Sequence, residues 1–128
     1  MPEQLSSQLI ELRERCAAFA KDHMLPLADS DRASAAVQVR EASKAAGLFT
    51  MTQPAHAAGQ LALCVARETL AAANPPALDA VFGPGAGVLG SVGEPLASSH
   101  LAPLLAGEKR GSFGFTEPDD AAPTAGVI

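Results

Sequence analysis

A glycine-rich stretch after the middle of the chain is the first feature whose spacing could serve chemistry. Gly85, Gly87 and Gly90 match the pattern Gly-x-Gly-x-x-Gly, which in dinucleotide-binding proteins brings a pyrophosphate to a helix N-terminus. That use needs a strand before the turn and an amphipathic helix after it, whereas Pro76 favours a helix before the glycines and Pro95 interrupts the segment after them. We therefore favour close helix packing here, with a small Rossmann-type binder as the lesser alternative.

The serine, histidine and aspartate residues that could support catalysis or bind a metal lack suitable spacing. Ser98, Ser99 and His100 are contiguous, so on a helix their side chains should point in different directions and form no serine-histidine pair. His56 and the Asp119-Asp120 pair do not have the spacing of metal ligands. The sequence thus predicts no metal site and no catalytic residue.

Composition narrows the class of protein. The 128 residues are 48% hydrophobic, with five Phe and neither Trp nor Tyr, which indicates one mostly helical folding unit with a thin core. Nine Lys and Arg against 14 Asp and Glu give a net charge of -5, the wrong sign for a broad nucleic-acid-binding face. There is no long apolar run and no signal-peptide pattern at the N-terminus. We expect a soluble cytoplasmic protein without a membrane span.

Apolar periodicity and capping signals predict about five helices. Four of the expected segments are residues 5–25, 60–73, 76–82 and 95–107, and the second helix should start after residues 29–31 and run to Ala46. Pro26 should stop the first segment, and Gly47 and Gly107 should stop the second and the last. Asp29, Ser30 and Asp31 are candidate N-caps of the second segment.

Two cysteines lie on predicted apolar stripes. Cys16 falls on the stripe of the first helix, and Cys64 falls on a stripe of the third helix together with Leu61 and Val65. Neither has a Cys or His companion at metal-ligand spacing. We interpret both as buried free thiols, and the sequence leaves open a disulfide between them.

The segment after the last helix is the only part that favours a strand. Residues 112–116 (Ser-Phe-Gly-Phe-Thr) alternate apolar and polar or small side chains, and Pro118 comes shortly after them. The residues after Pro118 are too few and too rich in Ala, Pro and Gly to complete a sheet. We predict a helical domain over residues 1–111 and the start of a truncated β domain over residues 112–128. The strand of this β domain should pair either with a part of the chain that is missing from this sequence or with another polypeptide.

Three segments, in order, resemble the N-terminal helical domain of the acyl-CoA dehydrogenase family. They are LRERCAAFAKDHMLPLAD in the first helix, KAAGLFTMTQP at the end of the second, and HLAPLLAGEKRGSFGFTEP from the last helix into the strand and a Thr-Glu-Pro turn. The likeness covers nearly the whole chain. It implies a mostly α fold of orthogonally packed helices with a short β-strand near the C-terminus.

The resemblance also implies a function. In that family the strand and turn lie against FAD and the acyl thioester, which points to Phe113, Phe115 and Thr116 as flavin-binding positions, Thr116 most strongly. The family reaction is α,β-dehydrogenation of an acyl-CoA in fatty acid metabolism, with a glutamate base from a C-terminal helical domain. Glu117 belongs to the turn and is not that base, so the isolated chain should be inactive. The remaining β and C-terminal helical domains, or a partner subunit, would complete a homo- or hetero-oligomeric enzyme.

Two departures from the family pattern support an alternative. The loop at residues 53–59 lacks a Gly-Gly pair, and Asp119-Asp120 stands where the family continues with small residues and Ser-Asp. Two carboxylates near an anionic cofactor are unfavourable. The alternative is therefore a non-catalytic helical interaction module, or a partner subunit, that has lost flavin binding. As part of the flavoenzyme, the glycine-rich stretch could line the acyl-chain cavity, although helix packing is its simpler use.

Overall fold

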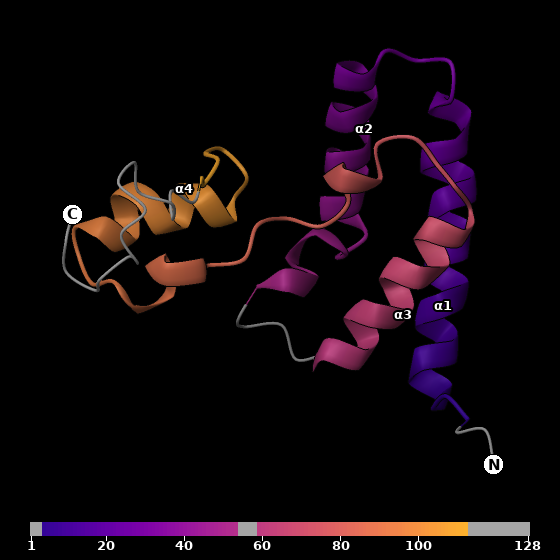
Figure 1. Cartoon of the computed structure of the whole chain (residues 1–128), viewed down its shortest axis with the longest axis horizontal. Coiled ribbons are helices and arrows are strands. Elements are labelled where there is room, and N and C mark those ends of the chain that lie inside the picture. Colours follow the sequence, from indigo (N-terminus) through magenta and orange to yellow (C-terminus); the bar gives the residue numbers. More distant parts are fainter. Residues whose placement is uncertain (1–3, 54–58, 113–128) are drawn as a thin grey trace, which may run out of the picture.

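The computed structural model describes residues 4–53 and 59–112 of the chain, and in these ranges it is mostly helical (Figure 1). Four α-helices are joined by 3-10 and π-helical turns, and the described residues contain no strand. The predicted helical class is thereby confirmed. Of the predicted strand, Ser112 is described and is not in a strand, while residues 113–116 lie outside the described residues.

The helices form two lobes (Figure 1). The larger lobe contains α1 (Ser7–Phe19), α2 (Arg32–Ala45) and α3 (Gly59–Ala72), with α1 and α3 packed against each other. The smaller lobe contains α4 (Ala102–Leu105), which continues a π-helical turn. None of the helices in residues 4–53 and 59–112 is long and apolar enough to cross a membrane.

The helical segment that starts with α1 ends near Pro26, as predicted, but its last two turns are not α-helical. After α1 the chain makes a π-helical turn over Ala20–Met24 and then a 3-10 turn over Leu25–Leu27. Pro26 lies at the start of the 3-10 turn, where its missing N–H is tolerated. Of the predicted stripe, Cys16 and Phe19 are buried, and Leu9 and Leu12 pack partly against the core.

Local signals place both ends of α2. The Asp31 carboxylate accepts hydrogen bonds from the backbone N–H groups of Ala33 (3.1 Å) and Ser34 (3.0 Å), so Asp31 is the N-cap among the three candidates. At the other end Gly47 has φ +73, a left-handed conformation that favours glycine. Both predictions from the sequence are confirmed.

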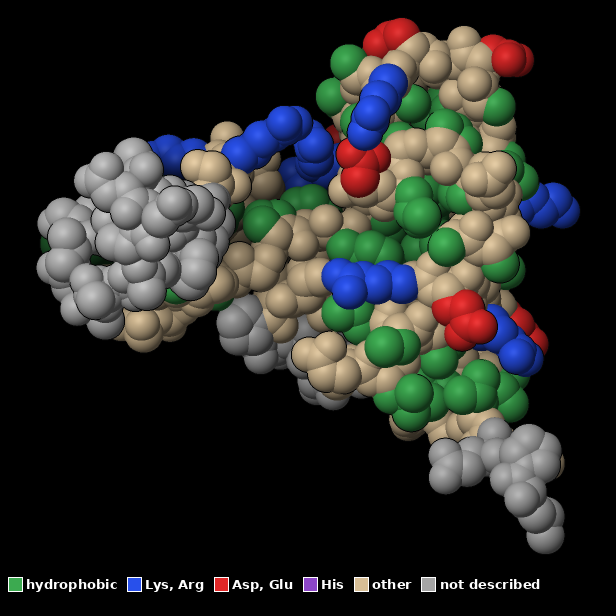
Figure 2. Space-filling view, in the orientation of Figure 1, with side chains coloured by type: hydrophobic (Ala, Val, Ile, Leu, Met, Phe, Trp, Pro, Cys, Tyr) green, Lys and Arg blue, Asp and Glu red, His purple; other side chains and the backbone are tan. Residues whose placement is uncertain are grey.

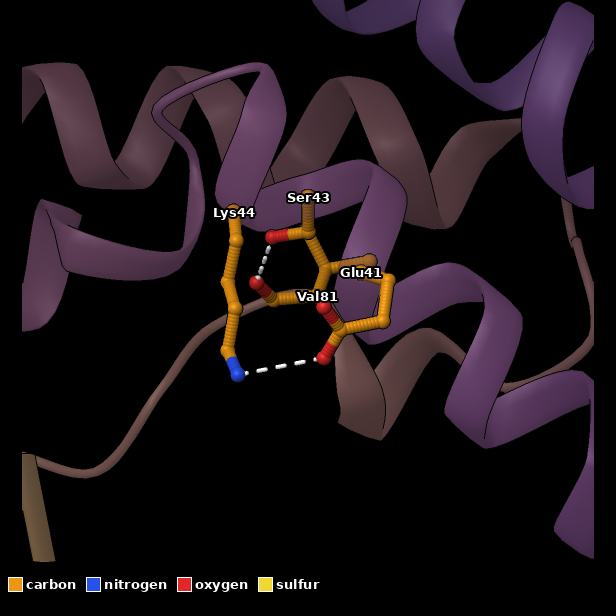
Figure 3. A network of polar contacts seen from close by, with 4 residues as sticks. All are labelled: Glu41, Ser43, Lys44 and Val81. Carbon is orange, nitrogen blue, oxygen red and sulfur yellow. Dashed lines mark hydrogen bonds and ion pairs between the residues drawn. The ribbon is translucent and has the colours of Figure 1, made fainter. Parts of the chain in front are cut away.

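The core lies where the three long helices and residues 48–51 meet. Its largest fully buried side chains are Cys16, Met24, Val39, Ser43, Leu70 and Val81. Among the described residues Ser43 is the one buried polar side chain, and its hydroxyl donates a hydrogen bond to the carbonyl of Val81 (Figure 3). One residue later the chain faces outward, and Lys44 Nζ lies 3.1 Å from Glu41 Oε1 (Figure 3). The Ser43 contact thus ties α2 to the segment after α3.

The predicted inner face of α3 was wrong in part, because Val65 is buried as expected but its predicted neighbours on the stripe are not. Leu61 is 60% exposed and Cys64 is exposed, whereas Leu63, Ala66 and Leu70 are buried. The residues of α3 are apolar on several sides, so more than one stripe satisfies the helical period. The stripe that buries two leucines around a small alanine removes more apolar surface from water and allows close approach to α1.

The predicted fourth helix at residues 76–82 does not form as an α-helix. The chain makes only a 3-10 turn over Leu78–Ala80. Asn74 and Ala77 both have positive φ, at 46 and 56, so helical geometry is broken before the turn, and Gly83 and Pro84 come after it. Positive φ at a residue with a side chain is costly and is held here by the surrounding packing.

The Phe49 ring joins the two lobes. A Cβ added at Gly83 would lie 2.5 Å from Phe49 Cε1, and one added at Gly107 would lie 2.9 Å from Phe49 Cζ. The backbone N–H of Gly83 also donates to the carbonyl of Phe49 at 2.9 Å. Nearby, Thr52 Oγ1 donates to the Gly83 carbonyl at 2.6 Å and Gln53 Nε2 to the Leu105 carbonyl at 2.8 Å. Leu48 and Phe49 are buried, as expected for a segment that folds back on α2.

We expect Gly83→Ala to destabilise the protein by about 1–3 kcal/mol, because the new methyl group would overlap the buried Phe49 ring. The free energy of unfolding, obtained from urea denaturation followed by circular dichroism, measures the effect. Gly93→Ala is the matched control, because a Cβ at Gly93 meets nothing within 4 Å. Equal stability of the two variants would contradict the close packing of Phe49 on Gly83.

The Asp31 cap should make stability depend on pH. Hydrogen bonds from Ser34 and Ala33 hold the pKa of the Asp31 carboxyl below its usual value. A lowered folded pKa adds stability above the unfolded pKa, and that stability is lost as pH falls through the folded pKa. We expect Asp31→Asn, which keeps a capping side chain, to lower Tm near neutral pH and to have a smaller effect near pH 2. Asp29→Asn is the control, because it removes the same charge at a residue that does not cap the helix. Its effect on Tm should not become smaller between neutral pH and pH 2.

Candidate functional site

The residues predicted to contact flavin, Phe113, Phe115 and Thr116, lie outside the described residues. The chain that leads to them is described as far as Ser112. Gly107 ends α4 with φ +77, and the N–H groups of Glu108 and Lys109 both donate to the Pro103 carbonyl, at 2.9 and 3.2 Å. The turn after α4 is therefore held against the end of that helix.

The Gly-x-Gly-x-x-Gly stretch does not have the structure of a dinucleotide-binding turn. Residues 83–86 form no regular element, and Gly87–Ser91 form a 3-10 turn instead of the start of an α-helix. Within residues 59–112 there is consequently no strand before the glycines, and no long helix begins at them whose N-terminus could bind a pyrophosphate. This geometry agrees with our expectation that the glycines do not form a Rossmann-type binding site. The Rossmann-type alternative is wrong.

The same glycines line a cavity of about 610 Å³. Its other walls come from α3 and from residues 51–53, so it lies between the glycine-rich stretch and the larger lobe. Met51 and Leu63 contribute apolar surface, whereas Gln53, Gln60 and Arg67 contribute polar groups. The simpler expectation of close packing holds for Gly83 in its contact with Phe49 and for Gly90, where an added Cβ would lie 3.2 Å from Ala86 Cβ. An added Cβ at Gly87 would meet nothing within 4 Å.

Ser99 and His100 are close to each other, which corrects the expectation that they would point apart. Ser99 Oγ lies 2.8 Å from His100 Nδ1 and also donates to the Pro95 carbonyl at 2.8 Å. Which of the two atoms donates in this contact depends on the histidine tautomer. The hydroxyl has a single proton, so it cannot donate to His100 and to Pro95 at the same time. The pair is exposed.

A second and larger cleft lies between the lobes. It measures about 850 Å³ and is bordered by α2, by residues 79–84 and by residues 107–111. Arg32 and Arg40 from α2 face Lys109 and Arg110 across it. Sequence analysis did not identify this cleft, although Lys109-Arg110 is the only adjacent basic pair in the chain.

The described residues offer no metal centre. Among residues 4–53 and 59–112, no group of three His, Cys, Asp or Glu side chains could hold an ion. His56, Asp119 and Asp120 lie outside these ranges.

The two cysteines differ in environment. Both are free, which answers the open question of a disulfide, and Cys16 is buried as predicted. Cys64 is exposed, because α3 turns a different face to the core than the one predicted. Burial raises the pKa of the Cys16 thiol, opposed in part by the charge of Arg15.

Comparison with known proteins gives no relative: no family model, no curated protein and no solved structure matches the chain. Function therefore has to be argued from the sequence segments and from the two cavities.

We expect one fast-reacting thiol per native chain. Cys64 should react with Ellman's reagent within seconds to minutes, whereas Cys16 should react only on unfolding, because the thiolate is the nucleophile and burial disfavours it. Absorbance at the thiolate product band measures both phases. Cys64→Ser should remove the fast phase and leave the slow one, and two fast thiols in the native protein would contradict the packing of α1.

Proposed function

We propose that this chain supplies the N-terminal helical part of an FAD-dependent oxidoreductase that resembles the acyl-CoA dehydrogenases. The observation that carries the proposal is the order of the three sequence segments, which span the first helix, the end of the second, and the last helix with its Thr-Glu-Pro turn. The helical class of the described residues is compatible with it.

In this proposal the chain positions the cofactor through the segment after α4. The Thr116 hydroxyl and backbone groups beside it would donate hydrogen bonds to the polar edge of the flavin, and Phe113 and Phe115 would contact it. A bound flavin would supply the hydride acceptor for dehydrogenation of the acyl thioester. The turn at residues 107–109, tied back to Pro103, fixes the point from which this segment starts.

The cavity beside the glycine-rich stretch is the proposed contribution to acyl-chain binding. Gly85, Gly87 and Gly90 line this cavity, Gly87 with open space where a side chain would stand, and Met51 and Leu63 give apolar contacts. Its volume of about 610 Å³ lies in the range of small-molecule sites. Gln53 and Gln60 at its border suit the polar thioester end better than the hydrocarbon tail.

The proton-abstracting base is assigned elsewhere. Among the described residues, no Asp or Glu lines the 610 Å³ cavity. The proposal therefore places the glutamate on the remaining β and C-terminal helical domains or on a partner subunit, in a cytoplasmic homo- or hetero-oligomer that acts on an acyl-CoA. The isolated chain should not oxidise acyl-CoA.

A non-catalytic interaction module is the second candidate. Asp119-Asp120 after the turn disfavours an anionic cofactor, and the larger lobe exposes apolar side chains at Val37 (56%) and Leu61 (60%). Such side chains on a helical surface can dock against another polypeptide. In this case the chain keeps the helical packing and has lost the flavin.

Thr116→Val in the complete assembly tests the cofactor role. Loss of one hydrogen bond to the flavin should weaken FAD binding about fivefold, as measured by fluorescence titration of the apoprotein, and should lower acyl-CoA turnover. Thr50→Val is the matched control, because Thr50 is exposed on a 3-10 turn of the larger lobe. Unchanged flavin affinity and turnover in Thr116→Val would favour the interaction module. Stoichiometric FAD binding with acyl-CoA oxidation by the isolated chain would refute the assignment of the base to another part.

A further inference from the structure

The cleft between the two lobes has a charge opposite to that of the whole chain. Among residues 4–53 and 59–112 it is lined by four Lys and Arg side chains and by two acidic ones, Asp79 and Glu108. The whole chain carries a net charge of -5. Figure 2 shows blue side chains gathered at the notch between the smaller lobe and the body of the molecule. Positive charge is therefore concentrated at this one concave place.

Two of the four cationic groups have partners, and the other two have none among the described residues. Arg32 pairs with Asp79 at 3.2 Å, and Lys109 Nζ donates to the Ser99 carbonyl at 2.8 Å. Arg40 and Arg110 make no ion pair or side-chain hydrogen bond with any residue in 4–53 or 59–112. Arg40 is half-buried, so its guanidinium is partly desolvated and gains more from a bound anion than a fully solvated one would.

The floor of the cleft is apolar. Phe49, Ala80 and Phe82 line it together with the backbone of Gly83 and Gly107. On the far side of Phe82, the Arg67 guanidinium lies 5.5 Å from the ring centroid. An occupant would thus meet hydrocarbon and glycine backbone at the bottom and guanidinium and ammonium groups at the rim.

We propose that this cleft binds a small organic phosphate with at least two negative charges, whose apolar part rests on the half-buried Phe82 ring, with the buried Phe49 ring beneath it. Arg40 and Arg110 each offer the planar fork of donors that matches phosphate oxygens. Lys109 adds a point charge from the same side. The volume of about 850 Å³ is sufficient for a nucleotide-sized molecule. This inference does not rest on the flavoenzyme proposal, because it uses only this chain's described residues and a different cavity.

Isothermal titration calorimetry of the full chain with inorganic pyrophosphate, ADP and adenosine tests the proposal. Pyrophosphate should bind and should weaken as NaCl is raised, since screening reduces charge attraction. ADP should bind more tightly than pyrophosphate because it also covers the apolar floor, and adenosine should bind more weakly than either. The absence of pyrophosphate and ADP binding at millimolar concentration would overturn the proposal.

Charge-neutralising variants locate the site. Arg40→Gln should weaken ADP binding about tenfold, and Arg110→Gln, at an exposed position, about threefold. Arg13→Gln, on the exposed face of α1, is the matched control and should leave affinity unchanged. If circular dichroism shows that Arg40→Gln does not fold, the ADP affinities of Arg110→Gln and Arg13→Gln are compared instead. Equal weakening by Arg13→Gln and Arg110→Gln would show general anion attraction and would overturn the site.

Discussion

The packing of the Phe49 ring against Gly83 and Gly107 is the constraint on which the arrangement of the two lobes depends. These glycines belong to segments that are far apart in the sequence, and a Cβ at either would lie within 3 Å of the ring. The Gln53 hydrogen bond to the Leu105 carbonyl adds a polar contact between the same parts. An aromatic ring supplies much of the apolar area in a chain with five Phe and no Trp or Tyr.

Helix ends could be predicted from the sequence because their causes are local. The Asp31 side chain reaches N–H groups two and three residues away, and Gly47 only has to adopt a left-handed conformation. The face of α3 could not be chosen, because an alanine-rich helix offers several equivalent stripes and α1 decides between them. The segment at 76–82 has helix-favouring residues, but positive φ at Asn74 and Ala77 breaks it, and that strain depends on tertiary packing.

The sites were harder to predict than the fold. The glycine spacing at 85–90 matched a dinucleotide-binding pattern, but the structure has a 3-10 turn at these residues and, within residues 59–112, no strand before them. The basic cleft brings Arg32 and Arg40 of α2 together with Lys109 and Arg110, which follow α4. These two pairs lie far apart in the sequence and form no recognisable sequence motif. From the sequence alone these residues would be interpreted as solvent-exposed surface charges. Only the tertiary packing of the helices places them around one cleft.

Residues 49–53 connect the two cavities physically. Phe49 lines the basic cleft, and Met51, Thr52 and Gln53 line the glycine-rich cavity. Thr52 also holds the Gly83 carbonyl, and Gly83 borders the basic cleft. Because this short turn is clamped at Phe49 and at Gln53, a ligand that displaced it from one side would move walls of both cavities. The two sites are therefore separate in chemistry, one cationic and one lined by glycine and apolar groups, but they share a structural support.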